Sequence, residues 1–118
     1  MTLEEIRHHC LGKPGVTEDI KWEHNLCFCV SEKLFALTNP DSYPVSAAFK
    51  VTDENFEELT DREGFRQAPY FAKHQWVYVD DINQLTAKEG RALLDEAYDM
   101  IFAKLPARTR KALRGKKK

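Results

Sequence analysis

Apolar residues near the start of the chain recur at helical spacing. Ile6 and Cys10 lie four positions apart, so one face of a helix would carry both. Thr2, followed three residues later by Glu5, has the form of a capping box, in which each side chain bonds the other residue's backbone N–H. Glycine and proline in residues 12–15 would end this helix. The pattern therefore predicts a short amphipathic helix here.

Two further helices are predicted by the same kind of pattern. Thr52 offers an N-cap for a helix that would turn Phe56 and Leu59 inward. A second capping box, Thr86–Glu89, opens the longest helix, which Pro106 limits. The apolar face of this longest helix consists of Leu93, Leu94, Ala97, Met100, Ile101 and Leu105.

Between the first two helices the apolar period changes from helical to alternating. The segments 26–30 and 45–51 alternate in the manner of strands, and the apolar run 34–37 lies between them. Asn39–Ser42 has turn chemistry, because proline fixes φ while Asn and Asp bond their own backbone. Gln75–Val79 reads as a further strand. We therefore expect three strands in the middle of the chain and strands again before the last helix.

Strands this close in sequence must pair mainly as antiparallel hairpins, since parallel pairing needs long crossovers. Helices on one face of such a sheet make a two-layer α+β fold, with the order α-β-β-β-α-β-β-α. The length of 118 residues suits one domain. We assign residues 1–107 to this domain and residues 108–118 to a basic C-terminal tail, which we expect to be flexible.

Charge is strongly segregated along the chain. The net charge is −1, but residues 108–118 carry seven cations and no acid, which leaves −8 for residues 1–107. An acidic body repels phosphate at long range, whereas a basic tail attracts it. This distribution counts against a broad nucleic-acid-binding face on the folded body.

The cysteines bear on compartment and on metal binding. An odd, sparse set of three, without a leader pattern, predicts free thiols in a reducing, cytoplasmic environment. No apolar run approaches the ~20 residues that a membrane span needs. Cys27 and Cys29 would share one face of a strand, but a zinc site needs four ligands and no second pair exists. Buried packing is the better interpretation, and we predict no metal or cofactor.

A catalytic site is not indicated either. Spacing alone permits a Cys–His pair between Cys10 and either His9 or His74. Cys10 lies on the apolar stripe of its helix, however, where a thiol is normally inert packing. The sequence contains no G-x-S-x-G and no glycine-rich phosphate loop. We therefore predict a protein that is not an enzyme.

Three stretches give the chain a family resemblance. They are VSEKLFA at Val30–Ala36, the pair Phe49 and Lys50, and APYFAKHQWV at Ala68–Val77. With these residues the chain resembles the MmcQ/YjbR family of small bacterial proteins, from about the first helix through Leu113. The resemblance implies a helix-backed antiparallel sheet of the frataxin-like and secretion-chaperone-like kind. It also implies DNA binding through two projecting hairpin loops, a "double wing".

Carried onto this sequence, the wings correspond to loops near Ser31–Lys33 and Asp41–Tyr43. The turn before Lys33 often holds glycine in this family and holds Glu32 here, so its backbone could differ. The resemblance, with the need for cations and stacking aromatics, gives five candidate DNA contacts. These are Lys33, Lys50, Lys73, His74 and Trp76.

Two alternatives stay open. Aromatic residues on an uncovered sheet face, from among Trp22, Tyr43, Tyr70 and Trp76, would make a platform for another protein, as in a chaperone-like module. The basic tail alone could also supply affinity for polyanions, or simply be a solubilising end. In the plainest interpretation Lys50 faces solvent and Trp76 fills the core. The partner, DNA or another protein, and the oligomeric state are left undecided by the sequence.

Overall fold

The computed structural model describes residues 1–22, 24–68 and 75–115. Six antiparallel strands form an open sheet in the order β1-β2-β3-β4-β6-β5. The strands are β1 (Val16–Lys21), β2 (Asn25–Val30), β3 (Lys33–Asn39), β4 (Ser46–Lys50), β5 (Phe65–Gln67) and β6 (Trp76–Val79). The helices are α1 (Leu3–Leu11), α2 (Asp53–Thr60), the 3₁₀ helix η2 (Ile82–Gln84), α3 (Ala87–Ala103) and α4 (Ala107–Arg114).

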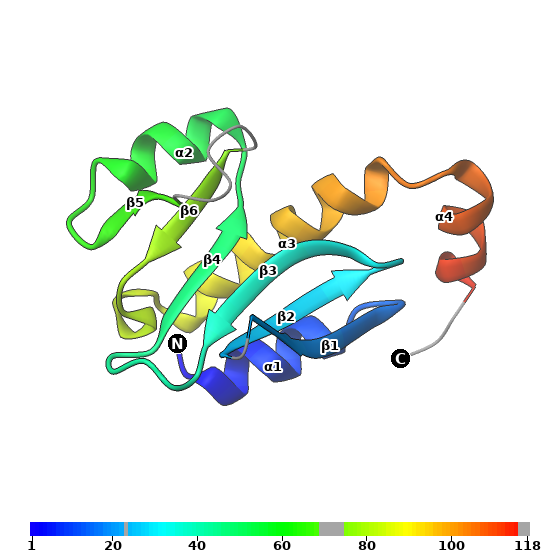
Figure 1. Cartoon of the computed structure of the whole chain (residues 1–118). Helices are drawn as coiled ribbons and strands as arrows, with labels where there is room; N and C mark the ends of the chain where they lie inside the picture. The colour runs from blue at the N-terminus through cyan, green and yellow to red at the C-terminus, as the bar shows by residue number, and fades with distance from the viewer. Residues whose placement is uncertain (23, 69–74, 116–118) are drawn as a thin grey trace.

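The helices α1 and α3 lie side by side across one face of the sheet (Figure 1). α2 packs beside β5 and β6, and α4 leaves the end of α3 beyond the β2–β3 side of the sheet. This arrangement confirms the predicted α+β class with helices backing an antiparallel sheet. The structure adds three elements that the sequence pattern did not predict: the edge strand β1, the 3₁₀ helix η2 and the helix α4.

Side-chain caps begin three of the helices where the sequence predicted them. The Thr2 hydroxyl accepts from the Glu5 backbone N–H, and the Glu5 carboxylate accepts from that of Thr2, which completes a capping box. Thr52 caps α2, and Thr86 caps α3 by accepting from the Glu89 N–H at 3.0 Å. Local capping chemistry thus sets the start of each helix.

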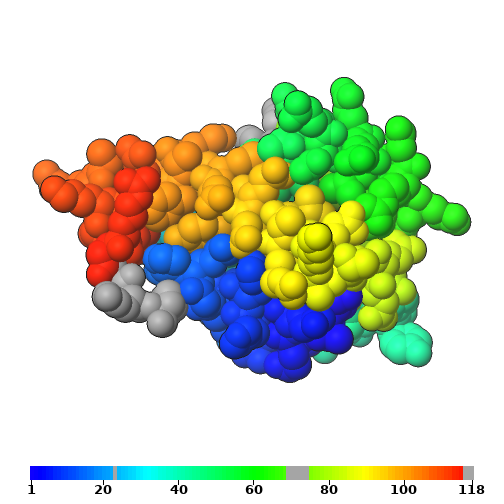
Figure 2. Space-filling view, turned by 180° about the vertical axis from the view of Figure 1, so that it is seen from behind, coloured from blue at the N-terminus to red at the C-terminus, as the bar shows by residue number. Residues whose placement is uncertain are grey.

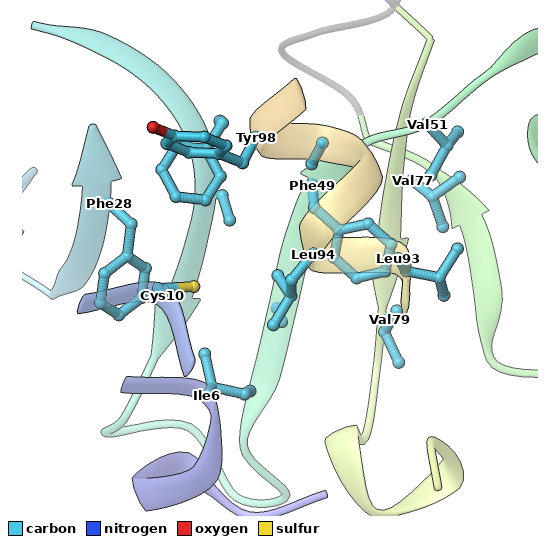
Figure 3. Packing of buried hydrophobic residues seen from close by; sticks show 14 of the residues in the cluster. Ile6, Cys10, Phe28, Phe49, Val51, Val77, Val79, Leu93, Leu94 and Tyr98 are labelled. Atoms are coloured by element: carbon cyan, nitrogen blue, oxygen red, sulfur yellow. The ribbon is translucent and has the colours of Figure 1, made fainter. Parts of the chain in front are cut away.

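The main core lies between the sheet and the two helices that cover it. Figure 3 shows Cys10 of α1 and Leu94 of α3 on the helix side of this core, with Phe28, Phe49 and Val77 on the sheet side. Phe28 and Val77 are fully buried. Burying an apolar side chain of this size stabilises a fold by roughly 1.5–3 kcal/mol. Apolar contact with the sheet therefore holds both helices in place.

A bulge in β3 supplies this core with an additional aromatic side chain. Phe28 pairs with Ala36, whereas the next residue, Cys29, pairs with Leu34, so Phe35 is extra on its strand. Phe35 and Ala36 therefore both join the main core, and Leu34 lies on the opposite face. The Phe35 ring meets the Tyr98 ring of α3 edge-on at 5.5 Å.

The sheet face turned away from α1 and α3 has its own small apolar cluster. Cys27, Leu37, Ala48 and Trp76 are buried there, with Tyr78 packed against them. Because these described side chains are buried, they do not offer the exposed aromatic platform that the sequence left open; Tyr70, another candidate for that platform, lies outside the described residues. Trp76 belongs to this second cluster and not to the helix-covered core.

The helix α4 returns the chain to the body after α3. α4 covers residues 107–114, most of the segment for which the sequence predicts a flexible tail. Leu113 is buried, and its side chain lies against Gly15, where the chain enters β1. The Arg114 guanidinium lies over the Phe102 ring of α3, 5.4 Å from its centre. Within the described ranges no helix has the length and apolar character to cross a bilayer.

Candidate nucleic-acid interface

The turn between β2 and β3 presents Lys33, the first candidate contact. Val30 and Lys33 are paired, so Ser31 and Glu32 form a two-residue turn. Both turn residues have positive φ, 49° for Ser31 and 67° for Glu32, which is the geometry of a type I′ hairpin. The turn is thus left-handed although it lacks glycine. Lys33 is exposed beside it.

Lys50 and Trp76 lie directly opposite each other on β4 and β6. Their exposed fractions are 9% and 4%, so neither side chain is presented for direct contact with a duplex. Burial lowers the pKa of Lys50, the nearby charge of Lys104 lowers it further, and Asp53 partly offsets both. The plainest interpretation of Lys50, a solvent-facing strand residue, is wrong. Trp76 is buried as expected, but in the second cluster and not in the helix-covered core. The other two candidates, Lys73 and His74, lie outside the described residues.

The two loops expected to form a pair of wings lie at opposite ends of the sheet. Successive turns of an antiparallel meander alternate between its ends, so the Ser31–Glu32 turn is remote from the loop between β3 and β4. The turn that shares an end with that loop joins β1 to β2. There His24 Nδ1 lies 3.4 Å from Asp41 Oδ2. The assignment of Ser31–Lys33 and Asp41–Tyr43 as one double wing is therefore wrong.

α4 carries the densest positive charge among the described residues. Arg108, Lys111 and Arg114 are three residues apart and exposed, so they form one row along the outer side of the helix. Leu113 faces the body instead, against Gly15. α4 forms one end of the molecule, at the left of Figure 2, with this row accessible from solvent.

Cations on the body are placed differently from those on α4. Four of them are held in ion pairs: Arg7 with Glu18, Lys13 with Asp95, Arg62 with Glu89, and Arg66 with Asp80. In the described part of the chain, no carboxylate comes within 4.0 Å of a cation of α4. The charges of Arg108 and Lys111 are therefore available to an outside anion, and that of Arg114 is exposed beside the Phe102 ring.

The remaining chemistry does not form a reactive site among the described residues. Burial raises the pKa of the Cys10 thiol to about 12 and that of Cys27 to about 11. Within the described ranges, no three His, Cys, Asp or Glu side chains are grouped to hold a metal ion. A core cavity of about 10 Å³, lined by Ile6, Phe49 and Leu94 among others, has room only for a water-sized guest.

Comparison with known proteins places the chain in a family. The family model YjbR matches residues 11–100, which is most of the chain. The chain belongs to the YjbR family. The predicted resemblance is thereby confirmed, while the match itself specifies no ligand.

Solved structures share the fold of this YjbR protein. A crystal structure of a Deinococcus radiodurans protein with a DUF419 domain has a TM-score of 0.85 and 25% identity, covering 96% of this chain and 88% of that one. A crystal structure of a Pseudomonas syringae protein has a TM-score of 0.68 and 23% identity, covering 85% of this chain and 98% of that one. No curated protein matches the chain.

α4 is the feature of this interface that sequence reasoning missed. Its charge was recognised, but its helical order was not. A signal was present: Pro106 is followed by eight residues without glycine, most of them good helix formers, and Leu113 provides an apolar anchor.

Proposed function

We propose that this YjbR protein is a small, non-enzymatic DNA-binding protein whose contact surface is the outer row of α4. The observation that carries the proposal is that Arg108, Lys111 and Arg114 are aligned, exposed and free of ion pairs within the described residues, on a body that is otherwise acidic. Phosphate contacts require cations in such a position.

The energetics of α4 support an anionic partner. Like charges three residues apart destabilise a helix by roughly 0.2–0.5 kcal/mol per pair. Arg108 also lies in the first turn, where the helix dipole disfavours a cation, and the N-cap Pro106 makes no side-chain cap. A phosphate backbone along the row would remove the repulsion. The helix is therefore expected to gain order when it binds a polyanion.

The family-implied use of DNA fits this surface better than it fits the sheet. Lys50 and Trp76 are buried, and the body of residues 1–107 has a net charge of −8. Lys33 is exposed and remains a candidate secondary contact. We also propose that the protein works in the reducing cytoplasm, because its three cysteines are all free thiols.

Fluorescence anisotropy on a labelled DNA duplex tests the proposal. We expect saturable binding at low salt that weakens as salt rises. The double variant Arg108→Gln/Lys111→Gln should bind about tenfold or more weakly at low salt. Its plot of log K against log salt should be shallower by about 2, since each lost phosphate contact removes about 0.9 from the slope.

The matched control is Lys88→Gln/Arg91→Gln on α3. These two cations are also exposed and three residues apart, so the control removes the same charge at the same spacing. If the control weakens binding as much as the α4 variant does, net charge explains the signal and the assigned surface is wrong. Absence of saturable binding by the wild type at low salt would remove the proposal altogether.

A further inference from the structure

β1 forms an unpaired edge of the sheet. It is terminal in the strand order, and among the described elements none lies outside it (Figure 1). Edge strands are usually blunted because their free N–H and C=O groups can pair with another chain. Here the edge is six residues long and ends in two exposed apolar side chains, Ile20 at 56% and Trp22 at 62%. The described residues contain three exposed large apolar side chains, so two of the three lie on or next to this strand.

The backbone of β1 determines which residues could pair across the edge. Val30 flanks the two-residue turn, so the N–H and C=O groups of Val30 bond to β3. Val16, which is paired with Val30 on β1, must therefore direct its own N–H and C=O groups away from β2. Accordingly Val16 N–H donates to the Lys13 carbonyl, and Ile20 N–H donates to Asp19 Oδ1. Backbone groups alternate along a strand. The N–H and C=O groups of Val16, Glu18 and Ile20 therefore point to the free edge, where the N–H groups of Val16 and Ile20 are bonded within their own chain.

We propose that β1 pairs with β1 of a second copy of this chain, in an antiparallel register with Ile20 opposite Ile20 of the partner copy. This register puts the outward backbone groups of the two Ile20 residues opposite each other. Each Ile20 N–H would exchange its bond to Asp19 Oδ1 for the Ile20 carbonyl of the partner copy, which releases the Asp19 carboxylate. It also places Asp19 of each copy opposite Lys21 of the other, so that two pairs of opposite charge form around an apolar centre. A twelve-stranded sheet would run through the dimer.

Other symmetric registers are disfavoured by charge. Centring on Glu18 opposes two glutamates, centring on Asp19 opposes two aspartates, and centring on Lys21 opposes two lysines. Like charges directly opposite each other across strands are destabilising. Registers centred on Val16 or Thr17 would bring the partner against Gly15, which Leu113 of α4 already covers. The strand sequence thus selects one alignment.

The interface between the two copies is small, so the dimer should be weak. Small interfaces belong to transient associations, and we expect a dissociation constant on the order of 100 μM. Two charge reversals give a decisive test by sedimentation equilibrium. Asp19→Lys and Lys21→Asp should each weaken self-association by about tenfold, because each creates two like-charge pairs. An equal mixture of the two variants should recover dimers, because every pair across the interface then has opposite charges.

The control is Glu57→Lys, an exposed reversal of equal size on α2, which should dimerise like the wild type. Circular dichroism on each variant establishes that it is folded. A wild type that stays monomeric at millimolar concentration overturns the proposal. So does an Asp19→Lys variant that dimerises normally, or a mixture that fails to recover dimers. None of these measurements involves DNA, so their outcome is independent of the proposed function.

Discussion

The residue that most clearly departs from expectation is Glu32. Its φ of 67° lies in the left-handed region, which costs an L-residue with a side chain roughly 1–2 kcal/mol. The sequence suggested that the backbone could differ where the family often has glycine. The structure shows a left-handed turn without the residue that favours it. The two-residue spacing between β2 and β3 requires the conformation whatever the side chain.

We therefore expect Glu32→Gly to stabilise the protein by about 0.5–1 kcal/mol. Glycine relieves the left-handed strain but loses more entropy on folding, which offsets part of the gain. Urea unfolding measures the change. Glu57→Gly, in the middle of α2, is the opposite control and should cost about 1 kcal/mol. Destabilisation by Glu32→Gly would show that the turn does not adopt this geometry in solution.

The buried thiols give a second prediction at this scale. With a pKa raised by burial to about 12, Cys10 holds almost no thiolate at neutral pH, and the same holds for Cys27 at about 11. We expect iodoacetamide at pH 8 to leave the native protein unlabelled, as mass spectrometry would report. In guanidinium chloride all three cysteines should react. Rapid labelling of the folded protein at Cys10 would reopen the catalytic Cys–His hypothesis.

At the scale of elements, amphipathic pattern and caps were sufficient for the helices. Thr2, Thr52 and Thr86 cap α1, α2 and α3 as predicted, because a cap depends only on neighbours in sequence. β1 was not predicted, because its polar composition reflects exposure at the sheet edge rather than a half-buried strand. A strand is recognised in a sequence by the apolar residues of its buried face, and β1 has almost no buried residues.

The candidate site was predicted less well for a related reason. Lys33 was correctly expected at a hairpin turn, but the burial of Lys50 depends on what surrounds β4 and β6 in space. Likewise, the assignment of the two loops as one double wing was wrong, because it depends on the end of the sheet at which each loop lies. The charge of residues 108–118 could be read from the sequence, whereas the order of α4 depends on a contact between Leu113 and Gly15, almost a hundred residues earlier.

That contact can be tested at the level of the helix. Leu113→Ala should loosen α4 from the body by about 1–2 kcal/mol, less than a central core truncation because the site is at the surface of the fold. Limited trypsin digestion should then cleave after Arg108 and Lys111 several times faster. Ala112→Ser, on the exposed side, is the control. Equal cleavage rates in the wild type and Leu113→Ala would mean that α4 is not docked in solution.

At the scale of the whole molecule, the two proposed surfaces occupy different places. The row on α4 lies at one end of the body, and Ile20 lies at the far end of β1 from the Gly15 contact that holds α4. Basic charge is gathered where an anion can approach, and the remaining surface is acidic. Because the two proposed surfaces are separate, binding of a polyanion at α4 would leave the β1 edge available to a second copy.

The fold is also closed by a contact that joins its first helix to α3. His9 Nε2 lies 2.7 Å from Asp95 Oδ1, and Lys13 Nζ forms an ion pair with the same carboxylate. Burial alone would raise the pKa of Asp95, but hydrogen bonds from Lys13 and His9, together with their charges, outweigh burial and lower it. A carboxylate whose pKa is lower in the folded state stabilises the fold above its unfolded pKa of about 3.9. This stabilisation is lost as pH falls through the lower, folded value.

Asp95→Asn should therefore destabilise the protein in a pH-dependent way. At pH 7 we expect a loss of about 1 kcal/mol, kept small because the Asp95 side chain is 45% exposed and solvent screens its charge. The difference in unfolding free energy from the wild type should shrink below about pH 4, where the wild-type carboxylate also becomes protonated. Asp99→Asn, exposed on the same helix, should show no such trend. If this difference in unfolding free energy stays the same at acidic pH, then the packing of the Asp95 side chain, and not its charge, stabilises the contact between α1 and α3.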